Sequence, residues 1–306
     1  MKILVATEKP FAAAAIQGIR EIIEGAGYEL ALLEKYTEKQ QLLDAVADAD
    51  GLIIRSDIVD NEVLDAAKNL KIVVRAGAGY DNVDLTSATA HNVCVENTPG
   101  QNSNAVAELA FGMMVMAARN MYDGKSGFEL KGKHLGIQAF GQVGRNVARI
   151  GQGFGMEVEA VDPYCPETAM IELNVKPVKT VAELYAGNQF VSINIPATPE
   201  TIKSINYELI TSMPKNGVLV NTARKEVIDE EGLERALADR TDLRYVSDVR
   251  SGNADALLEK FPGRVFFTPK KMGAQTAEAN ANAGTAAAHQ TVAFLRDGID
   301  KFRVNR

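Results

Sequence analysis

The sequence predicts an α/β protein with two doubly wound parallel sheets. Three observations predict this class: short β-rich runs alternate with segments of helical period, the alternation occurs in two separate series, and the second series opens with a glycine-containing turn between a strand and a helix. The length of 306 residues exceeds what one hydrophobic core usually organises, so two domains are expected.

The first series starts at the amino terminus. Short aliphatic runs indicate strands, and apolar residues at three- and four-residue intervals indicate the helices between them. The expected strands are 2–7, 28–33, 51–55 and 71–75, with helices over 16–23 and near 42–47. Near Asn97, turn residues open a long apolar-faced helix, which we expect to lead into the second domain.

The second series has the number of strands expected of a dinucleotide-binding sheet. The expected strands are 134–140, 157–162, 189–196, 217–223, 243–249 and 264–269, with a helix from about Val143. An alanine-rich helix over about 274–295 is followed by a short tail, and we expect it to pack on the first domain. The expected domains are therefore residues 1–97 plus 284–306, and residues 98–283.

Composition excludes several classes of function. The net charge of −7, with basic and acidic residues interspersed, argues against nucleic acid as a partner. Cys94 and Cys165 lie far apart, so neither a disulfide framework nor a metal site is expected. The amino-terminal apolar run is too short for a signal peptide, and the longest apolar stretch, near residues 111–118, is too short to cross a membrane. A cytoplasmic protein without a membrane partner is therefore expected.

The strand-to-helix turn at residues 139–144 predicts a dinucleotide site. Ala139, Gly141 and Gly144 have the spacing of a G-x-G-x-x-G turn, with alanine in place of the first glycine. Gly141 would let the backbone approach a pyrophosphate, and Gly144 would permit close packing of helix on strand. Gln142 and Val143 complete the turn. The same turn without a ligand is common in α/β proteins.

Asp162, at the end of the next expected strand, indicates which dinucleotide binds. Its carboxylate lies at the distance along the chain where the ribose hydroxyls of NAD are bound, and it would repel the 2′-phosphate of NADP. Pro163 and Tyr164 provide no compensating arginine. The cofactor is therefore expected to be NAD, although Asp162 could also cap a loop.

Four further stretches give the chain its resemblance to a known family. They are RAGAGYDNVDL from Arg75, NTPGQNSNAVAELAFGMM from Asn97, NTARKEVIDEEGL from Asn221, and SDV from Ser247 with TPKKMGAQT from Thr268. In order and spacing they resemble the signature segments of the D-isomer-specific 2-hydroxyacid dehydrogenases. This resemblance implies a Rossmann-type NAD domain inserted into a flavodoxin-like substrate domain.

The resemblance also assigns roles to residues. Arg224 matches the catalytic arginine of the family, which would hold the substrate carboxylate and carbonyl by a bidentate fork. A structural ion pair with Asp229 or Glu226 is the alternative. Further cofactor-binding positions are implied at Ile195, Pro196, Thr222, Ala223, Asp248, Gly273 and Ala274.

Two positions depart from the family pattern. Counted from Asp248, the position of the family's glutamate holds Asn253, and that of its histidine holds Lys271. A lysine starts with a pKa near about 10.4 and needs a lower one to act as a base, so a neutral Asn253 suits it better than a glutamate would. The hypothesis is that Lys271 accepts the hydroxyl proton. Alternatives are that Lys270 takes this role or that catalysis has been lost.

The three histidines are not expected to replace Lys271. His91 lies in an expected turn, His134 begins a strand at the wrong end of the sheet, and His289 lies on the last helix. Each is therefore expected to be structural.

Arg55 and Arg75 indicate the substrate class. Each ends an expected strand, and open α/β sheets bind ligands at the carboxyl ends of their strands. Both match phosphate-binding positions of the phosphoglycerate dehydrogenase subgroup, and Gly77, Asn102 and Ser103 could donate to the carboxylate or nicotinamide amide. Pairing of these arginines with Asp57 or Asp81 is the alternative.

The function that the resemblance implies is NAD-dependent oxidation of 3-phospho-D-glycerate to 3-phosphohydroxypyruvate, which begins serine biosynthesis. The chain resembles short members of this subgroup, in which lysine replaces the histidine and no regulatory ACT domain follows, so no serine feedback is expected. Another 2-hydroxyacid dehydrogenase, acting on glyoxylate, hydroxypyruvate or lactate, and a non-catalytic NAD-binding sensor or corepressor-like protein are the alternatives. A homodimer through the helix after Asn102 is also implied.

Overall fold

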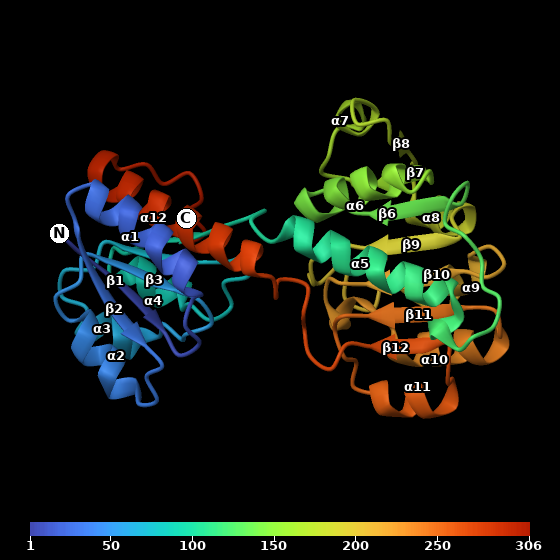
Figure 1. The fold of residues 1–306 in the computed structure, drawn as a ribbon, viewed down its shortest axis with the longest axis horizontal. Helices are drawn as coiled ribbons and strands as arrows, with labels where there is room; N and C mark the ends of the chain where they lie inside the picture. The colour runs from blue at the N-terminus through green and yellow to red at the C-terminus, as the bar shows by residue number, and fades with distance from the viewer. The chain divides into compact units, whose positions relative to one another are not determined.

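The computed structural model describes the whole chain, residues 1–306, as two compact units (Figure 1). The first unit combines Met1–Asn102 with Gln275–Arg306, and the second is Ser103–Ala274. The sequence placed these limits at 97/98 and 283/284. The observed limits differ from these because the chain passes between the units at the turns before helices α5 (Ser103–Ala118) and α12 (Ala277–Asp297). Each helix therefore belongs to a single unit.

A five-stranded parallel sheet forms the first unit. Its strand order is β2-β1-β3-β4-β5, the flavodoxin-like order. The strands are β1 (Lys2–Thr7), β2 (Glu29–Glu34), β3 (Gly51–Ile54), β4 (Ile72–Arg75) and β5 (Cys94–Asn97). Strand β5 was not expected, because Val95 is its only aliphatic residue and one such residue does not form a strand pattern.

Helices cover both faces of this sheet. They are α1 (Ala13–Gly25), α2 (Lys39–Val46), α3 (Asn61–Ala66), α4 (Leu85–Ala90) and α12. Along β1, Ile3 and Val5 lie in the core beneath α1 and α12, which run side by side, whereas Leu4 and Ala6 lie in the core beneath α2, α3 and α4 (Figure 1). This alternation follows from the two-residue period of a strand.

The carboxyl-terminal tail binds the edge of this sheet at β5. The Val95 N–H donates to Oδ1 of Asn305 at 2.9 Å, and the Val304 N–H donates to the Val95 carbonyl at 2.8 Å. The Glu96 side chain is 1% exposed, and its Oε1 accepts the Phe302 N–H at 3.0 Å. The tail thus satisfies the backbone groups that an edge strand would otherwise leave without partners.

A seven-stranded parallel sheet forms the second unit, in the order β12-β11-β10-β9-β6-β7-β8. The strands are β6 (His134–Gln138), β7 (Glu157–Val161), β8 (Lys176–Pro177), β9 (Phe190–Ile193), β10 (Val218–Asn221), β11 (Arg244–Ser247) and β12 (Val265–Phe267). From β8 to β11 this is the Rossmann order, with β12 added at one edge. The predicted fold class of two doubly wound parallel sheets is therefore confirmed.

Two apolar cores enclose the second sheet. Helices α5 and α6 (Gln142–Gly153) lie over one face (Figure 1). The other face carries α8 (Val181–Gly187), α9 (Tyr207–Ser212), α10 (Glu230–Asp239) and α11 (Ala254–Lys260), while the short α7 (Glu167–Ile171) precedes β8. Two 3₁₀ turns, η1 (Asn120–Tyr122) and η2 (Lys225–Val227), complete the unit.

Helix α5 is apolar because it is buried in its own unit. Ala107, Phe111, Met114 and Ala118 belong to the core beneath it. None of the helices in the structure combines the length and the apolar character needed to cross a membrane.

The buried Glu96 gives a pH-dependent contribution to stability. Burial raises the pKa of its carboxyl, Asp300 raises it further, and Oε2 has no hydrogen-bond partner. Because the folded chain holds this proton to a higher pH than the unfolded chain, folding loses stability as the pH rises from the ordinary glutamate pKa through the folded one.

Glu96→Gln should therefore raise the unfolding temperature at pH 7, where it removes the cost of a buried charge. The gain should shrink toward zero as the pH falls below the ordinary glutamate pKa of about 4.3. Thermal unfolding followed by circular dichroism across this range measures it, with the exposed Glu21→Gln as control. A gain that is independent of pH would contradict this account.

Candidate functional site

The turn between β6 and α6 has the backbone of a dinucleotide-binding turn. Ala139, at the position of the first glycine, has a φ of 74°, a left-handed conformation that strains any residue with a Cβ. A Cβ on Gly144 would lie 2.3 Å from the Ala139 carbonyl oxygen, so glycine is required there by helix–strand packing. The predicted packing role of Gly144 is thus visible in the geometry.

Gly141, the second glycine position of the turn, indicates a ligand-binding role. Gly141 has an ordinary φ of −74°, and a Cβ on it would meet no protein atom within 4 Å. The fold itself therefore does not need glycine here. Gly141 is also the N-cap of α6 and offers no side-chain oxygen to the first-turn N–H groups, which leaves them suited to an anion such as a pyrophosphate.

Asp162 follows β7 and holds the neighbouring loops. Its Oδ2 accepts the Phe140 N–H at 2.8 Å, and its Oδ1 accepts the Tyr164 N–H at 2.8 Å. The loop-capping role that was the alternative is thus present. Because a carboxylate oxygen has a second acceptor site, this arrangement also leaves room for ribose hydroxyls.

Two buried polar atoms without hydrogen-bond partners lie at the carboxyl ends of two further strands of the second sheet. Asn194 Oδ1 follows β9, and Thr222 Oγ1 follows β10, which is the neighbouring strand. Buried polar atoms usually have a partner, so these two fit a bound polar group, as the amide and ribose of NAD would supply. The sequence pattern did not indicate Asn194 but the next residues, the buried Ile195 and the exposed Pro196.

Arg224 and Lys271 are brought together at one carbonyl oxygen. Arg224 Nη1 donates to the Ala223 oxygen at 3.0 Å, and Lys271 Nζ donates to the same oxygen at 3.4 Å. The turn that carries Arg224 is held by Asn221, whose Oδ1 accepts the Ala223 N–H and whose Nδ2 donates to the Arg224 carbonyl, each at 2.9 Å. The alternative ion pairs of Arg224 with Asp229 and Glu226 are not formed.

Asp248 holds the segment that carries Lys271. Its carboxylate is 1% exposed and accepts the Met272 N–H at 2.6 Å, the Gly273 N–H at 2.8 Å and the Thr268 hydroxyl at 2.9 Å. Both oxygens are therefore used by the chain itself. These hydrogen bonds hold the chain on either side of Lys271. The predicted contact of Asp248 with the cofactor remains a prediction. The partly buried Ala274 follows this segment.

Asn253 has local partners. Its Oδ1 accepts the Ser251 hydroxyl at 2.9 Å, and its Nδ2 donates to the Glu230 carbonyl at 3.3 Å. The Glu230 carboxylate in turn accepts the Gly252 N–H at 2.8 Å. Asn253 thus stabilises the start of α11, and these contacts do not include Lys271.

The histidines lie outside these clusters. His91 caps α4 and contacts Asp65 at 2.9 Å, His134 lies 3.6 Å from Glu157, and His289 lies within α12.

In the first unit, Arg55 and Arg75 stand at the ends of adjacent strands. Arg75 is the last residue of β4 and pairs in register with Ile54, so Arg55 follows directly beside it. Arg55 donates to the carbonyls of Lys9 and Pro10 and, at 2.6 Å, to Oδ1 of Asn280. These acceptors are neutral, and burial lowers the pKa of the Arg55 guanidinium. The alternative pairing with Asp57 fails, because that carboxylate accepts backbone N–H groups and the Tyr36 hydroxyl.

Gly77 makes room for Arg75. Its φ is 151°, and a Cβ on it would lie 1.5 Å from Nη1 of Arg75. The guanidinium therefore lies directly against the Gly77 backbone, so this glycine positions Arg75. Asn102 ends the first unit and Ser103, 2% exposed, begins α5.

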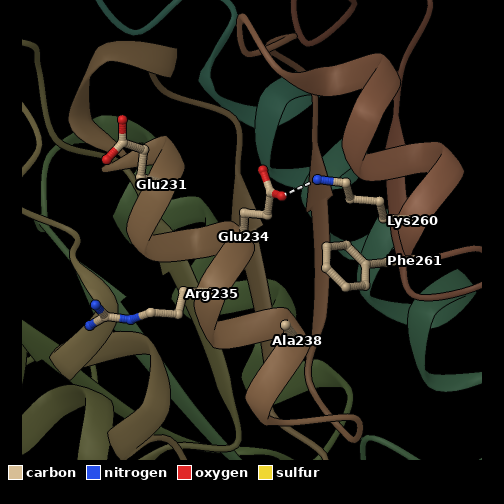
Figure 2. Close-up of a pocket in the computed structure, with 6 residues that line it drawn as sticks. All are labelled: Glu231, Glu234, Arg235, Ala238, Lys260 and Phe261. Atoms are coloured by element: carbon tan, nitrogen blue, oxygen red, sulfur yellow. Dashed lines mark hydrogen bonds and ion pairs between the residues drawn. The ribbon is translucent and has the colours of Figure 1, made fainter.

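A separate pocket of about 570 Å³ lies between α10 and α11 (Figure 2). It is lined by Glu231, Glu234, Arg235, Ala238, Lys260 and Phe261, and Lys260 pairs with Glu234 across it. None of the predicted site residues lines it. No cluster of histidine, cysteine and acidic residues in the structure could hold a metal ion.

Comparison with known proteins decides the family. Residues 104–269 match the model of the D-isomer specific 2-hydroxyacid dehydrogenase, NAD binding domain. The chain belongs to this family. Over 289 residues it is 35% identical to a D-3-phosphoglycerate dehydrogenase of Methanocaldococcus jannaschii, with 87% of this chain and 54% of that protein covered. The chain spans about half the length of the curated phosphoglycerate dehydrogenases it matches.

Two other similar proteins are matched by this chain over more of their own length. A hydroxypyruvate reductase of Thermotoga maritima is 38% identical over 221 residues, covering 67% of this chain and 70% of that protein. The crystal structure of an NAD⁺-bound 3-phosphoglycerate dehydrogenase of Entamoeba histolytica superposes with a TM-score of 0.88 and 47% identity, covering 100% of this chain and 99% of that one. Family membership and the fit of the β6–α6 turn make NAD the cofactor of the second unit.

The left-handed Ala139 is expected to cost the fold stability. Ala139→Gly should stabilise the protein by roughly 0.5–1 kcal/mol, because the relief of strain exceeds the added entropy of the unfolded chain. Ala238→Gly is the control, since Ala238 lies exposed in α10 and the same change should cost about 0.5–1 kcal/mol there. Denaturant unfolding of both variants gives the comparison, and equal losses would refute the strain.

Proposed function

We propose that the chain is an NAD-dependent dehydrogenase that oxidises 3-phospho-D-glycerate to 3-phosphohydroxypyruvate, with Arg224 binding the substrate and Lys271 as the general base. The observation that carries this proposal is the convergence of Arg224 and Lys271 on the Ala223 carbonyl oxygen. A cation that binds a carboxylate and an amine that can exchange a proton are then adjacent, as oxidation of a 2-hydroxyacid requires.

Each residue has one task in this reaction. Arg224 binds the substrate carboxylate and the oxygen that becomes the keto group. Lys271 Nζ, in its neutral form, accepts the hydroxyl proton, and Asp248 keeps the Lys271 segment in place. NAD, when bound at the β6–α6 turn, supplies the hydride acceptor. In the reverse direction the protonated Lys271 returns the proton to the keto oxygen.

The phosphate is assigned to the first unit. Arg55 and Arg75 are two guanidinium groups at the carboxyl ends of adjacent strands, and the Arg55 guanidinium donates its hydrogen bonds to neutral acceptors. Because a guanidinium matches a phosphate bidentately, this pair favours a phosphorylated hydroxyacid over an unphosphorylated one. The phosphoglycerate dehydrogenases among the relatives support the same choice.

A second candidate is reduction of hydroxypyruvate or a similar short 2-ketoacid without phosphate. The relative from Thermotoga maritima, named as a hydroxypyruvate reductase, favours it. The two reactions share Arg224 and Lys271 and differ only in their need for Arg55 and Arg75. The proposal also includes a place in serine biosynthesis and a cytoplasmic location. We further propose a homodimer through α5, which gel filtration with light scattering tests.

The direct test is NADH formation with 3-phosphoglycerate and with glycerate. Arg75→Met should raise KM for 3-phosphoglycerate by roughly 10- to 100-fold and change that for glycerate little, because one charge-assisted pair is lost. Gly77→Ala should reproduce this effect by expelling the guanidinium. Arg20→Met, at an exposed arginine of α1, is the control. Equal effects on both substrates would favour the unphosphorylated candidate.

Lys271→Ala should lower turnover by roughly 10²–10⁴-fold while leaving NADH affinity within about threefold, because a positioned base acts on the chemical step. In the unmodified protein the oxidation rate should rise with pH to a plateau, since the neutral amine is required. Lys270→Ala is the matched control at the exposed neighbouring residue. Near-full activity of Lys271→Ala, or loss in Lys270→Ala instead, would exclude Lys271 as the base.

A further inference from the structure

Arg145 carries a positive charge beside the loop that follows β7. It lies in the first turn of α6, one residue after Gly144, and is partly buried. Its Nε donates to the Phe140 carbonyl at 3.2 Å, its Nη2 lies 3.5 Å from Sγ of Cys165, and its guanidinium lies 5.2 Å from the centre of the Phe140 ring. All of these partners are neutral.

Asp162 binds the other backbone group of Phe140. It accepts the Phe140 N–H, whereas Arg145 binds the Phe140 carbonyl. The loop from Asp162 to Cys165 is likewise held at both ends, by Asp162 at Tyr164 and by Arg145 at Cys165. A carboxylate and a guanidinium thus flank one residue without forming an ion pair with each other.

This placement corrects the sequence argument about the cofactor. Pro163 and Tyr164 indeed provide no arginine, but α6 delivers one to the same loop from the other side of the glycine turn. We propose that Arg145 is a specificity-determining residue: a latent binding group for the 2′-phosphate of NADP, which the adjacent Asp162 carboxylate keeps from being used. The inference rests on NAD binding at the β6–α6 turn and goes beyond the proposed reaction.

The physical reason for this proposal is that the negative charge of Asp162 and the positive charge of Arg145 act in opposite directions on a phosphate bound at the ribose. With Asp162 ionised, a 2′-phosphate meets a carboxylate at the position where ribose hydroxyls bind, and like charges repel. Without that charge, the Arg145 guanidinium, which contacts Cys165 of the same loop, offers donors suited to phosphate oxygens. Lys179, which lines the pocket beside Asp162, is paired with Glu167 at 2.5 Å. Selection against NADP is therefore attributed to Asp162, and the gain on its removal to Arg145.

The experiment is calorimetric titration of NADH and NADPH, without substrate, into four proteins. These are the unmodified chain, Asp162→Asn, the double variant Asp162→Asn with Arg145→Met, and the double variant Asp162→Asn with Arg149→Met. Asn keeps one acceptor oxygen for the loop while removing the charge. Arg149 lies one turn further along α6 and bonds to Asn104 at 2.8 Å, so its replacement removes the same charge from the same helix.

Asp162→Asn should strengthen NADPH binding by roughly 10- to 100-fold, and Arg145→Met in that background should abolish the gain, whereas Arg149→Met should preserve it. NADH affinity should stay within about threefold between the Asp162→Asn protein and both doubles. Added salt should weaken NADPH binding to Asp162→Asn more than to its Arg145→Met double.

Three results would overturn the proposal. The first is no gain of NADPH binding in Asp162→Asn, and the second is an equal gain when Arg145 is also replaced. The third is an equal loss of NADH and NADPH in the Arg145 double, which would make Arg145 a loop clamp only. Since no turnover is measured, failure of the proposed dehydrogenase reaction leaves these results intact, while absence of NADH binding in the unmodified chain would remove their basis.

Discussion

The parallel pairing of strands is the constraint on which every functional position depends. A parallel strand can be followed by another only through a crossover, so the strands of each sheet all end at the same edge. In the second unit the pairing register also aligns these ends, because Gln138 pairs with Val161 and Ile193, and Asn221 pairs with Ile193 and Ser247. The residues that directly follow these strands are Ala139, Asp162, Asn194, Thr222 and Asp248.

Hydrogen bonds to the backbone then turn this row of strand ends into a site of fixed shape. Asn221 holds the turn that carries Arg224, and Asp248 holds the segment that carries Lys271. Each uses a buried polar side chain to satisfy N–H groups in loops that no neighbouring strand can reach. Arg224 and Lys271 are therefore held in place by the side chains of Asn221 and Asp248.

The sequence predicted the fold class and most of the strands, because fully buried parallel strands appear as short aliphatic runs. It missed β5, which has one aliphatic residue, and β8, which has only two residues. The limits of the two units also differed from those expected, because they depend on where α12 packs. Arg224, Lys271, Arg55 and Arg75 were predicted as site residues because the family motifs and strand ends mark them, and these assignments remain predictions.

Residues that act through long-range contacts could not be found in the same way. Arg145 lies twenty residues before Cys165, and nothing in the local sequence shows that a helix returns it to that loop. The available sequence signal for Arg145 was its position directly after Gly144, the third position of the glycine turn. Asn194 could have been found by asking which polar residue directly follows each expected strand.

The composition of the first unit from distant parts of the chain has a consequence for synthesis. One face of the five-stranded sheet, including Ile3, Val5 and Ile53, is covered by α1 together with α12. During translation this face emerges first but lacks α12 until about 170 further residues, those of Ser103–Ala274, have been made. The second unit is contiguous and can fold as soon as it leaves the ribosome. The first sheet is thus the part of the nascent chain that keeps an apolar face uncovered until α12 has been made.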